Sequence, residues 1–361
     1  MLFSFKQKSQ DFIVEEQLPF ELSWTGDAFF VYFEKRNLTT MEVIDFLCKE
    51  LKISRMTLGF AWLKDKDAIT RQRVSIYKSA LKKIGGEFVF LDTLAQRARI
   101  ISTGRNEKPI GMTTEIRNTF FIRLRALKKL SQVEKQQTQD SISSLFERGF
   151  PNVFGDQRFG IEGKNRKLWK DLLEGTVKIK EKFEAKFKLQ SYSSWLFNEY
   201  VYARIHKGLE LLDGEIVEID TDTGKVLGYY DAKKRVIQTF QDVHAGKDFF
   251  HYPSHPGEAI PYSPDFKIHI TGPILGFDLL MPAVATPAGQ KEKMLFDKQW
   301  LTKEKLAPYK NNQIFGIRRR MRTWPQKAKY HFDADDLLIE FTLDSGVYAS
   351  VLIDLLLANF K

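Results

Sequence analysis

Asp65 has neighbours in the sequence that suit a chemically active carboxylate. It lies in the charged segment KDKDAITRQ, residues 64–72, together with Lys64, Lys66 and Arg71. Nearby cations favour the charged form of a carboxyl group, so Asp65 should remain ionised. An ionised and positioned aspartate can act as a nucleophile or as a base. The alternative is a solvated hairpin tip that carries charges of both signs.

A second segment, TFFIRLRA at residues 119–126, alternates in the way a β-strand requires. Side chains of a strand point to opposite faces in turn, so each face takes every second residue. One face is apolar, and the other is largely basic. The apolar face comprises Phe120, Ile122 and Leu124, and the basic face comprises Phe121, Arg123 and Arg125. The pattern predicts a strand with one buried or pocket-facing side.

The elements that must hold the Asp65 segment can be predicted from local patterns. Residues 28–35, AFFVYFEK, are aromatic and β-branched and predict a strand. Thr39 followed three residues later by Glu42 is a capping box, which predicts a helix over about residues 40–51. The charged loop itself lies between two short strand-like runs, residues 58–61 and 74–76. A later apolar periodicity predicts a helix over about residues 193–211.

Length and charge indicate the kind of partner. With 361 residues and 42.0 kDa, the chain should form two domains, or one domain with a large insertion. Lys and Arg number 56 against 46 Asp and Glu, a net charge of +10, and the pI is about 9.3. This surplus favours a polyanionic partner such as nucleic acid. The 30 phenylalanines could supply both a core and surfaces for base stacking.

Several classes of protein are disfavoured by what the sequence lacks. One cysteine, Cys48, excludes a disulfide framework and a cysteine zinc site and is typical of the reducing cytoplasm. Six scattered histidines give no metal-binding pattern, and no nucleotide-cofactor fingerprint is present. No run of 18 apolar residues occurs, so no membrane span is predicted, and we expect no membrane partner. We therefore expect a cytoplasmic protein without a metal or small-molecule cofactor.

Six ordered segments give the chain a resemblance to a known family. Together they resemble the motifs of the TruD family of tRNA pseudouridine synthases, in the family's order and over nearly the whole chain. The ordered set is far more specific than any one motif. The segments are Lys6 with DFIVEE at 11–16, GFAWLKDKDAITRQ at 59–72, NTF at 118–120, PNVFGDQRFG at 151–160, TGPILG at 271–276 and GVYAS at 346–350.

The resemblance implies an α+β fold with a mixed, mainly antiparallel sheet flanked by helices. The catalytic pseudouridine synthase domain would be discontinuous and comprise residues 1–153 and 307–361. Residues 154–306 would form the family-specific insertion domain and make a cleft for RNA. The chain would act as a monomer on tRNA, and the family's usual target is the uridine at position thirteen of the D arm.

The resemblance also implies a reaction. Pseudouridine formation breaks the N1–C1′ bond of a uridine, turns the detached uracil and rejoins it through C5, without a cofactor. The catalytic carboxylate would be Asp65, and the cation beside it would be Lys6. Whether Asp65 attacks uracil, attacks C1′ or acts as a base stays open at this stage.

The substrate uridine must leave the RNA stack to be reached. By resemblance, Phe120 would stack on uracil and Asn118 would hydrogen-bond near the catalytic carboxylate. Residues 118 and 120 share a strand face, so both can line one pocket. Phe12 would pack at the pocket entrance, and Tyr348 would close it from a C-terminal strand. For the three aromatic residues the alternative is ordinary core packing.

Affinity for RNA should come mainly from phosphate contacts. The candidates are Arg123, Arg125, Arg158 and Arg319, the last within the run 318–320. For each of them, the alternative is a solvated surface charge. Two other functions remain open: a synthase that acts on another structured RNA, and a catalytically silent RNA-binding protein with the same fold.

Overall fold

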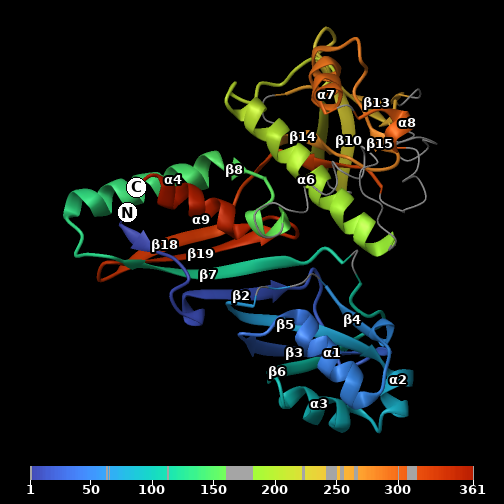
Figure 1. Cartoon of the computed structure of the whole chain (residues 1–361), viewed down its shortest axis with the longest axis vertical. Coiled ribbons are helices and arrows are strands. Elements are labelled where there is room, and N and C mark those ends of the chain that lie inside the picture. The colour runs from blue at the N-terminus through green and yellow to red at the C-terminus, as the bar shows by residue number, and fades with distance from the viewer. Residues whose placement is uncertain are drawn as a thin grey trace. The chain divides into compact units, whose positions relative to one another are not determined.

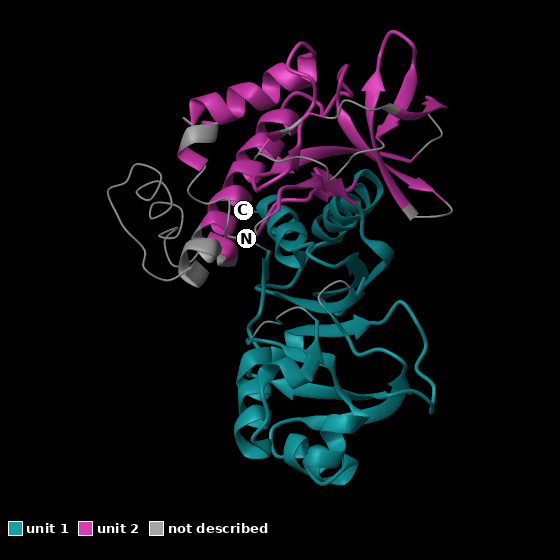
Figure 2. Ribbon diagram, turned by 90° about the vertical axis from the view of Figure 1, so that its right-hand side faces the viewer, with its two compact units in different colours: residues 1–148, 324–361 teal, residues 149–323 magenta. Residues whose placement is uncertain are grey.

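The computed structural model divides the chain into two compact units (Figures 1 and 2). The first comprises Met1–Arg148 and Trp324–Lys361, and the second comprises Gly149–Thr323. The structure describes residues 2–61, 64, 66–111, 114–159, 182–221, 224–240, 250–252, 256–263, 267–299, 301–306 and 315–360.

The division into units differs from the boundaries that the sequence analysis placed after residues 153 and 306. The strands at the ends of the second unit explain the difference. β8 (Phe150–Pro151) pairs with β17 (Arg322–Thr323), and β16 (Ile317–Arg320) pairs with β14 (Ile268–Ile274). These ladders tie residues 150–151 and 317–323 to the second unit, which therefore extends further at both ends.

The first unit is built on a nine-stranded sheet in the order β18-β19-β7-β2-β5-β3-β6, with β1 added to β7 and β4 added to β5. The β2–β5 pair is parallel, and the other pairs in this sheet are antiparallel. The expected mixed, mainly antiparallel α+β fold is thus confirmed. The strands are β1 (Phe3–Ser4), β2 (Phe12–Gln17), β3 (Ala28–Arg36), β4 (Leu58–Phe60), β5 (Ile69–Tyr77), β6 (Arg99–Asn106), β7 (Arg117–Ala126), β18 (Gln326–Asp333) and β19 (Asp336–Asp344).

The helix predicted over residues 40–51 is α1 (Thr40–Leu51), and its start is set by the predicted capping box. The Thr39 hydroxyl accepts the Glu42 amide at 3.0 Å, and the Glu42 carboxylate accepts the Thr39 amide at 2.6 Å. These contacts satisfy two backbone donors that a helix start otherwise leaves unpaired. The helix ends at Lys52, which adopts the left-handed conformation at φ 53°.

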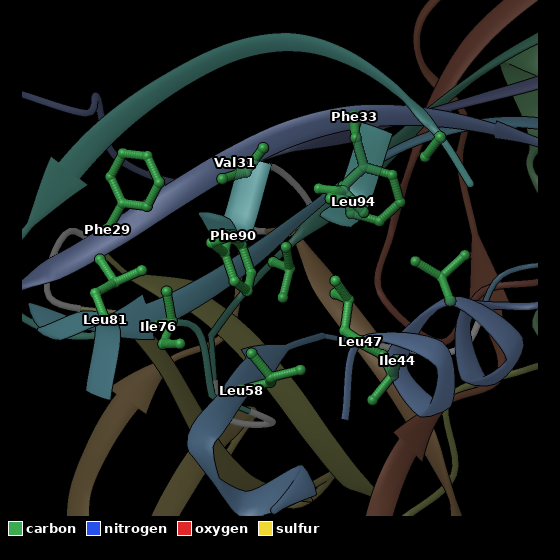
Figure 3. Close-up of a cluster of buried hydrophobic side chains, with 13 residues drawn as sticks. Phe29, Val31, Phe33, Ile44, Leu47, Leu58, Ile76, Leu81, Phe90 and Leu94 are labelled. Atoms are coloured by element: carbon green, nitrogen blue, oxygen red, sulfur yellow. The ribbon is translucent and has the colours of Figure 1, made fainter. Parts of the chain in front are cut away.

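One face of α1 packs onto the sheet and forms a hydrophobic core of the first unit (Figure 3). Val43, Ile44 and Leu47 recur at helical spacing, so all three meet the sheet. Their partners include Phe33 of β3 and Ile76 of β5. Further helices of this unit are η1 (Ser9–Asp11), η2 (Arg55–Thr57), α2 (Lys78–Lys83), α3 (Glu87–Ala95), α4 (Gln132–Arg148) and α9 (Ala349–Ala358).

The predicted alternation of β7 is confirmed. Phe120, Ile122 and Leu124 are buried, whereas Arg123 and Arg125 are half-buried on the opposite face. β7 lies between β2 and β19, so its apolar face receives neighbours from both sides. This central position makes β7 the strand around which the candidate site is arranged.

The second unit carries a six-stranded sheet in the order β13-β11-β10-β9-β14-β16. Its strands are β9 (Ile216–Thr221), β10 (Gly224–Asp231), β11 (Val236–Phe240), β13 (Pro256–Pro261), β14 and β16, and β12 (Phe250–His251) pairs separately with β15 (Leu279–Leu280). Described helices of the unit are η3 (Asp156–Phe159), α6 (Lys182–Ile205), α7 (Pro287–Lys298) and α8 (Lys303–Leu306).

The helix predicted over residues 193–211 is α6, and the predicted bounds are wrong at both ends. α6 is already helical at Lys182 and ends at Ile205. Gly208 and Leu209 adopt φ values of 87° and 52°, which a right-handed helix cannot accommodate. In the sequence, Leu211 continues the apolar pattern past Ile205. In the fold, however, Leu211 packs against the apolar cluster of β9 and β11 and does not belong to α6.

The TGPILG segment joins α6, β14 and β16. A Cβ atom on Gly272 would meet Cε2 of Phe197 at 2.9 Å, so only glycine fits there without a shift of the Phe197 ring of α6. The Thr271 hydroxyl donates to the Ile216 carbonyl at 2.7 Å and accepts from Nε of Arg318 at 3.1 Å. The motif is therefore a packing and hydrogen-bonding junction inside the second unit.

Candidate functional site

Asp65 lies outside the described residues, but its neighbours on both sides are described and contact the start of α1. The Lys64 amide donates to Oγ1 of Thr40 at 3.0 Å, and Nζ of Lys66 donates to Oε1 of Glu42 at 3.2 Å. Hydrogen bonds from the Thr39 backbone, from the Thr39 side chain and from Lys66 lower the pKa of Glu42 to about 2. The chain on each side of position 65 is thus tied to the first turn of α1.

The Lys64 side chain crosses to the sheet and reaches Asn118 of β7. Its Nζ donates to Oδ1 of Asn118 at 2.5 Å and lies 4.0 Å from Oε2 of Glu16. Glu16 on β2 and Asn118 on β7 are directly opposite each other in the ladder, so Lys64 contacts a cross-strand pair. The sequence analysis assigned no role to Glu16 and treated Lys64 only as a neighbour of Asp65.

Glu16 is almost fully buried and is held by the adjacent strand. Its Oε1 accepts the Arg73 amide at 3.1 Å, and its backbone carbonyl accepts Nη1 of Arg73 at 2.7 Å. Burial raises the pKa of Glu16, and the cations of Lys64 and Arg73 act against that rise. The carboxylate of Glu16, the ammonium of Lys64 and the side-chain amide of Asn118 thus form one compact polar group at β2 and β7.

The predicted aromatic residues lie next to that polar group. Phe120 is opposite Val14 on β2 and opposite Phe341 on β19. Its ring centroid lies 6.0 Å from that of Phe12 and 5.4 Å from that of Phe341, with which it stacks at 27°. Phe120 is 7% exposed, so only a small part of the ring is open to a base.

Lys6 lies over this aromatic row. Its Nζ is 4.1 Å from the centroid of the Phe12 ring, a cation–π distance. Lys6 adopts a left-handed backbone conformation with φ 56°, which is uncommon for a residue other than glycine. The structure therefore brings Lys6, Phe12 and Phe120 together, whereas the predicted place of Lys6 beside Asp65 lies outside the described residues.

Tyr348 does not lie on a strand, so this detail of the sequence analysis is wrong. β19 ends at Asp344, and Tyr348 is the N-cap residue of α9. Gly346, with φ 80°, makes the turn between the two elements. The end of β19 is nonetheless beside the predicted site, because Leu343 is opposite Asn118 in the ladder.

The two arginines of the first unit that are predicted to bind RNA both have acidic partners in the chain. Arg125 donates to the two carboxylate oxygens of Asp11 at 2.8 and 2.7 Å. Arg123 donates to Asp336 at 2.9 Å and to Asp333 at 2.8 Å. Burial acts to raise the pKa of Asp11, but the hydrogen bonds from Arg125 and from the Lys8 amide outweigh it and lower that pKa.

The two arginines of the second unit that are predicted to bind RNA also form hydrogen bonds within the chain. Arg319 donates to the carbonyl of Asn152 at 3.0 Å and to its Oδ1 at 2.6 Å, and its guanidinium lies 4.4 Å from the Phe154 ring centroid. Arg158 donates to the Ser194 hydroxyl at 3.3 Å. Each arginine has more donors than these contacts use.

Two polar side chains on β5 add to the candidate site of the first unit. Oγ1 of Thr70 and Nε2 of Gln72 are buried and have no hydrogen-bond partner among the residues that the structure describes. Oε1 of Gln72 accepts the Thr40 hydroxyl, which in turn accepts the Lys64 amide. Buried groups without partners are rare in folded proteins, and they are often met by water or a ligand.

Within the described ranges, no group of three or more His, Cys, Asp or Glu residues is arranged to hold a metal ion. The helices of those ranges likewise include none that is long and apolar enough to cross a membrane.

A model of the family described as tRNA pseudouridine synthase D (TruD) matches residues 3–179 and 170–354 of this chain. The match extends over nearly the whole sequence. The chain belongs to the tRNA pseudouridine synthase D family. The motifs at Lys6, Asp65, Asn118 and Gly346 all fall within the matched ranges.

Individual relatives agree with the family assignment. The chain is 29% identical over 364 residues to tRNA pseudouridine synthase D of Nitratiruptor sp. and 28% identical over 363 residues to that of Wolinella succinogenes. Each alignment covers 98% of this chain and 94% of the relative. A crystal structure of a TruD protein from Methanosarcina mazei shares the fold, with a TM-score of 0.64 at 17% identity, over 98% of this chain and 93% of that one.

Proposed function

We propose that this protein is an enzyme that isomerises a uridine of tRNA to pseudouridine. Membership in the tRNA pseudouridine synthase D family supports this reaction class. The observation that carries the proposal is the contact of Lys64 with Asn118. It joins the segment that contains Asp65 to the strand that contains Phe120, so the residues proposed for catalysis and for base binding belong to neighbouring segments.

In the proposed reaction, the Asp65 carboxylate starts cleavage of the N1–C1′ bond, either by attack or as a base. Lys6 is proposed to keep a positive charge beside that carboxylate. An ammonium near a carboxylate favours its ionised form, which either role requires. The position of Lys6 over Phe12 supports this role, because Phe12 belongs to the aromatic row beside Asn118.

We further propose that the flipped-out uracil meets the open part of Phe120 and a hydrogen bond from Asn118. Phe12 and Tyr348 would border the base. Because Phe120 is packed between Phe12 and Phe341, its ring is held in one orientation and would not need to be ordered by the substrate. A preorganised stacking surface costs little entropy when the base arrives.

The proposed substrate is the uridine at position thirteen in the D arm of tRNA, bound by a monomer without a cofactor. The net charge of +10 supports an RNA partner. Arg123, Arg125, Arg158 and Arg319 would contribute contacts to tRNA phosphates. The contribution of each of these arginines is a separate prediction.

Pseudouridine mapping tests the proposal directly. Total RNA from cells with and without the gene should differ at one tRNA position, and the purified protein should restore the modification in vitro. Asp65→Asn should abolish product formation while it leaves tRNA binding in place. Asp67→Asn is the matched control, because it removes a carboxylate two residues away.

Two results would contradict the proposal. If the wild-type protein makes no pseudouridine in any tRNA yet binds tRNA, the silent RNA-binding function is correct. If the lost site lies in another RNA, the substrate assignment is wrong and the reaction class is retained.

A further inference from the structure

We propose that Lys64 is a positioning residue that fixes the side-chain amide of Asn118, so that its N–H donors serve the uracil carbonyl oxygens. The inference rests on the proposed function and assigns to Lys64, supported by Glu16, a role in the same reaction. It also specifies that Asn118 is the donor, and the base the acceptor, of the hydrogen bond between them.

The orientation of the amide follows from elementary hydrogen-bond chemistry. A lysine ammonium can only donate, so the atom of Asn118 that faces Nζ of Lys64 at 2.5 Å must be the oxygen Oδ1. The amide is planar, so its NH₂ group points away from Lys64. No acceptor for Nδ2 of Asn118 occurs in the part of the chain that the structure describes, so both N–H donors are available to a ligand.

Contacts with three other described residues hold Lys64 in place. Its amide is bonded to Thr40, its Nζ to Asn118, and the same Nζ lies 4.0 Å from Oε2 of Glu16. The side chain is 6% exposed, so it cannot exchange these contacts for water without opening the site. Glu16 is fixed in turn by the Arg73 amide. The oxygen of Asn118 is therefore not free to rotate toward the base.

The orientation of the Asn118 amide matters because negative charge develops on uracil during the reaction. When the N1–C1′ bond breaks, its electron pair stays with uracil and is shared by N1 and the carbonyl oxygens O2 and O4. C5 then bonds to C1′ and loses its proton, and N1 gains one. Attack by a carboxylate on the ring also places negative charge on a carbonyl oxygen. In every route an N–H donor stabilises the charge that develops, whereas a carbonyl oxygen in its place would repel it.

Asn118→Asp tests the donor directly. Aspartate keeps the shape of the side chain and an oxygen for Lys64, but it replaces the NH₂ group with a second acceptor. We expect the single-turnover rate of pseudouridine formation to fall by about 10²–10³-fold, as for the loss of one oxyanion donor. The Kd for tRNA should change little, because the change acts on the chemical step.

Lys64→Met tests the positioning role, with Lys66→Met as the matched control. Both lysines adjoin Asp65, but among the described residues Lys66 forms its ion pair with the exposed Glu42. Lys64→Met should lower the rate by about 10²-fold, the cost of a misplaced group, and Lys66→Met should leave it nearly unchanged. Lys64→Arg keeps a donor-only cation and should recover part of the loss. If Lys64→Met is poorly folded, Glu16→Gln/Lys64→Met removes both buried charges and should show the same kinetic defect.

Substrates with altered carbonyl oxygens test the hydrogen bond itself, because a purely structural role of Asn118 would not depend on which atom the base presents. In tRNA with 2-thiouridine or 4-thiouridine at the target position, sulfur is a poorer acceptor than oxygen. One of the two substitutions should slow the wild-type enzyme and have no further effect on Asn118→Asp. If both slow the variant as much as the wild type, or if Asn118→Asp is fully active, this inference and the proposed hydrogen bond from Asn118 to uracil are overturned, while the proposed isomerisation of a tRNA uridine stands. A wild-type protein that makes no pseudouridine overturns both.

Discussion

The buried ion pair between Arg318 and Glu292 leads to a prediction that separates fold stability from RNA binding. Arg318 neighbours the proposed RNA-binding Arg319, but its side chain is 1% exposed and that of Glu292 is 0% exposed. Nη2 and Nη1 of Arg318 donate to the two carboxylate oxygens at 2.6 and 2.9 Å. Two further bonds reach Oγ1 and the carbonyl oxygen of Thr271, at 3.1 and 2.9 Å.

Arg318→Met keeps an apolar stem of similar length and removes the charge. Glu292 would then be buried without its counterion, a defect that typically costs about 3–5 kcal/mol of unfolding free energy. For a unit of this size, each kcal/mol lowers Tm by roughly 2–4 °C, so the midpoint of the second unit should fall by about 6–20 °C. Because Arg318 is buried, the salt dependence of tRNA binding by the folded protein should not change.

The pH dependence of this defect has a definite sign. Burial raises the pKa of Glu292, and the Arg318 guanidinium acts against that rise, so the pKa should rise further in the variant. A carboxyl with a raised pKa favours the folded state at low pH and loses that effect as pH rises through the folded-state pKa. The difference in stability between wild type and Arg318→Met should therefore be smaller in mild acid than at neutral pH.

Scanning calorimetry and urea unfolding at several pH values would measure these changes. Arg318→Met/Glu292→Met replaces both charges with apolar groups and should recover most of the loss, as buried pairs replaced in this way usually do. Arg320→Met is the matched control on the same strand. Its loss of stability should be smaller because Arg320 and its two partners, Glu218 and Asp220, are 18%, 15% and 42% exposed, so water can solvate the carboxylates that the variant leaves without a counterion. A loss below about 1 kcal/mol for Arg318→Met, with no recovery in the double variant, would refute the reasoning.

Three further predictions concern single contacts. Asp11→Asn removes a carboxyl group whose pKa is lowered in the fold, so its ionised form stabilises the protein above the unfolded-state pKa. Thermal melts from about pH 6 to pH 3 should show that the wild type loses this stabilisation as pH falls through the lowered pKa, whereas the variant does not. Thr39→Ala removes the cap of α1 and should cost about 1 kcal/mol in urea unfolding, and an unchanged midpoint would contradict the capping argument. Gly272→Ala places a Cβ atom 2.9 Å from the Phe197 ring and should destabilise the second unit by roughly 1–3 kcal/mol, which calorimetry would detect.

Features that depend on a few consecutive residues could be predicted from the sequence. The capping box at Thr39 and Glu42 set the start of α1 because both partners lie within one turn. The alternation of residues 119–126 identified both faces of β7 because the pleat of a strand has a period of two. The end of α6 was missed because it depends on backbone conformations at Gly208 and Leu209 that apolar periodicity does not encode.

The motifs predicted Asp65, Asn118 and Phe120 as site residues, but they could not show which contacts hold the described ones, Asn118 and Phe120, in place. Lys64 and Asn118 are 54 residues apart, and their contact needs both the start of α1 and the register of β2 against β7. Arg125 and Asp11 are 114 residues apart, so the sequence showed a free basic side chain where the fold forms an ion pair.

By itself, the sequence determined the family and the positive charge suited to RNA, and it predicted the reactive carboxylate and the aromatic and amide side chains for a base. Only the tertiary structure decided which charges remain available for a ligand and which are used within the chain. The physical reason is that a charge acts over a few ångströms of space, and those neighbours are set by strand register and helix packing, which a linear pattern does not contain.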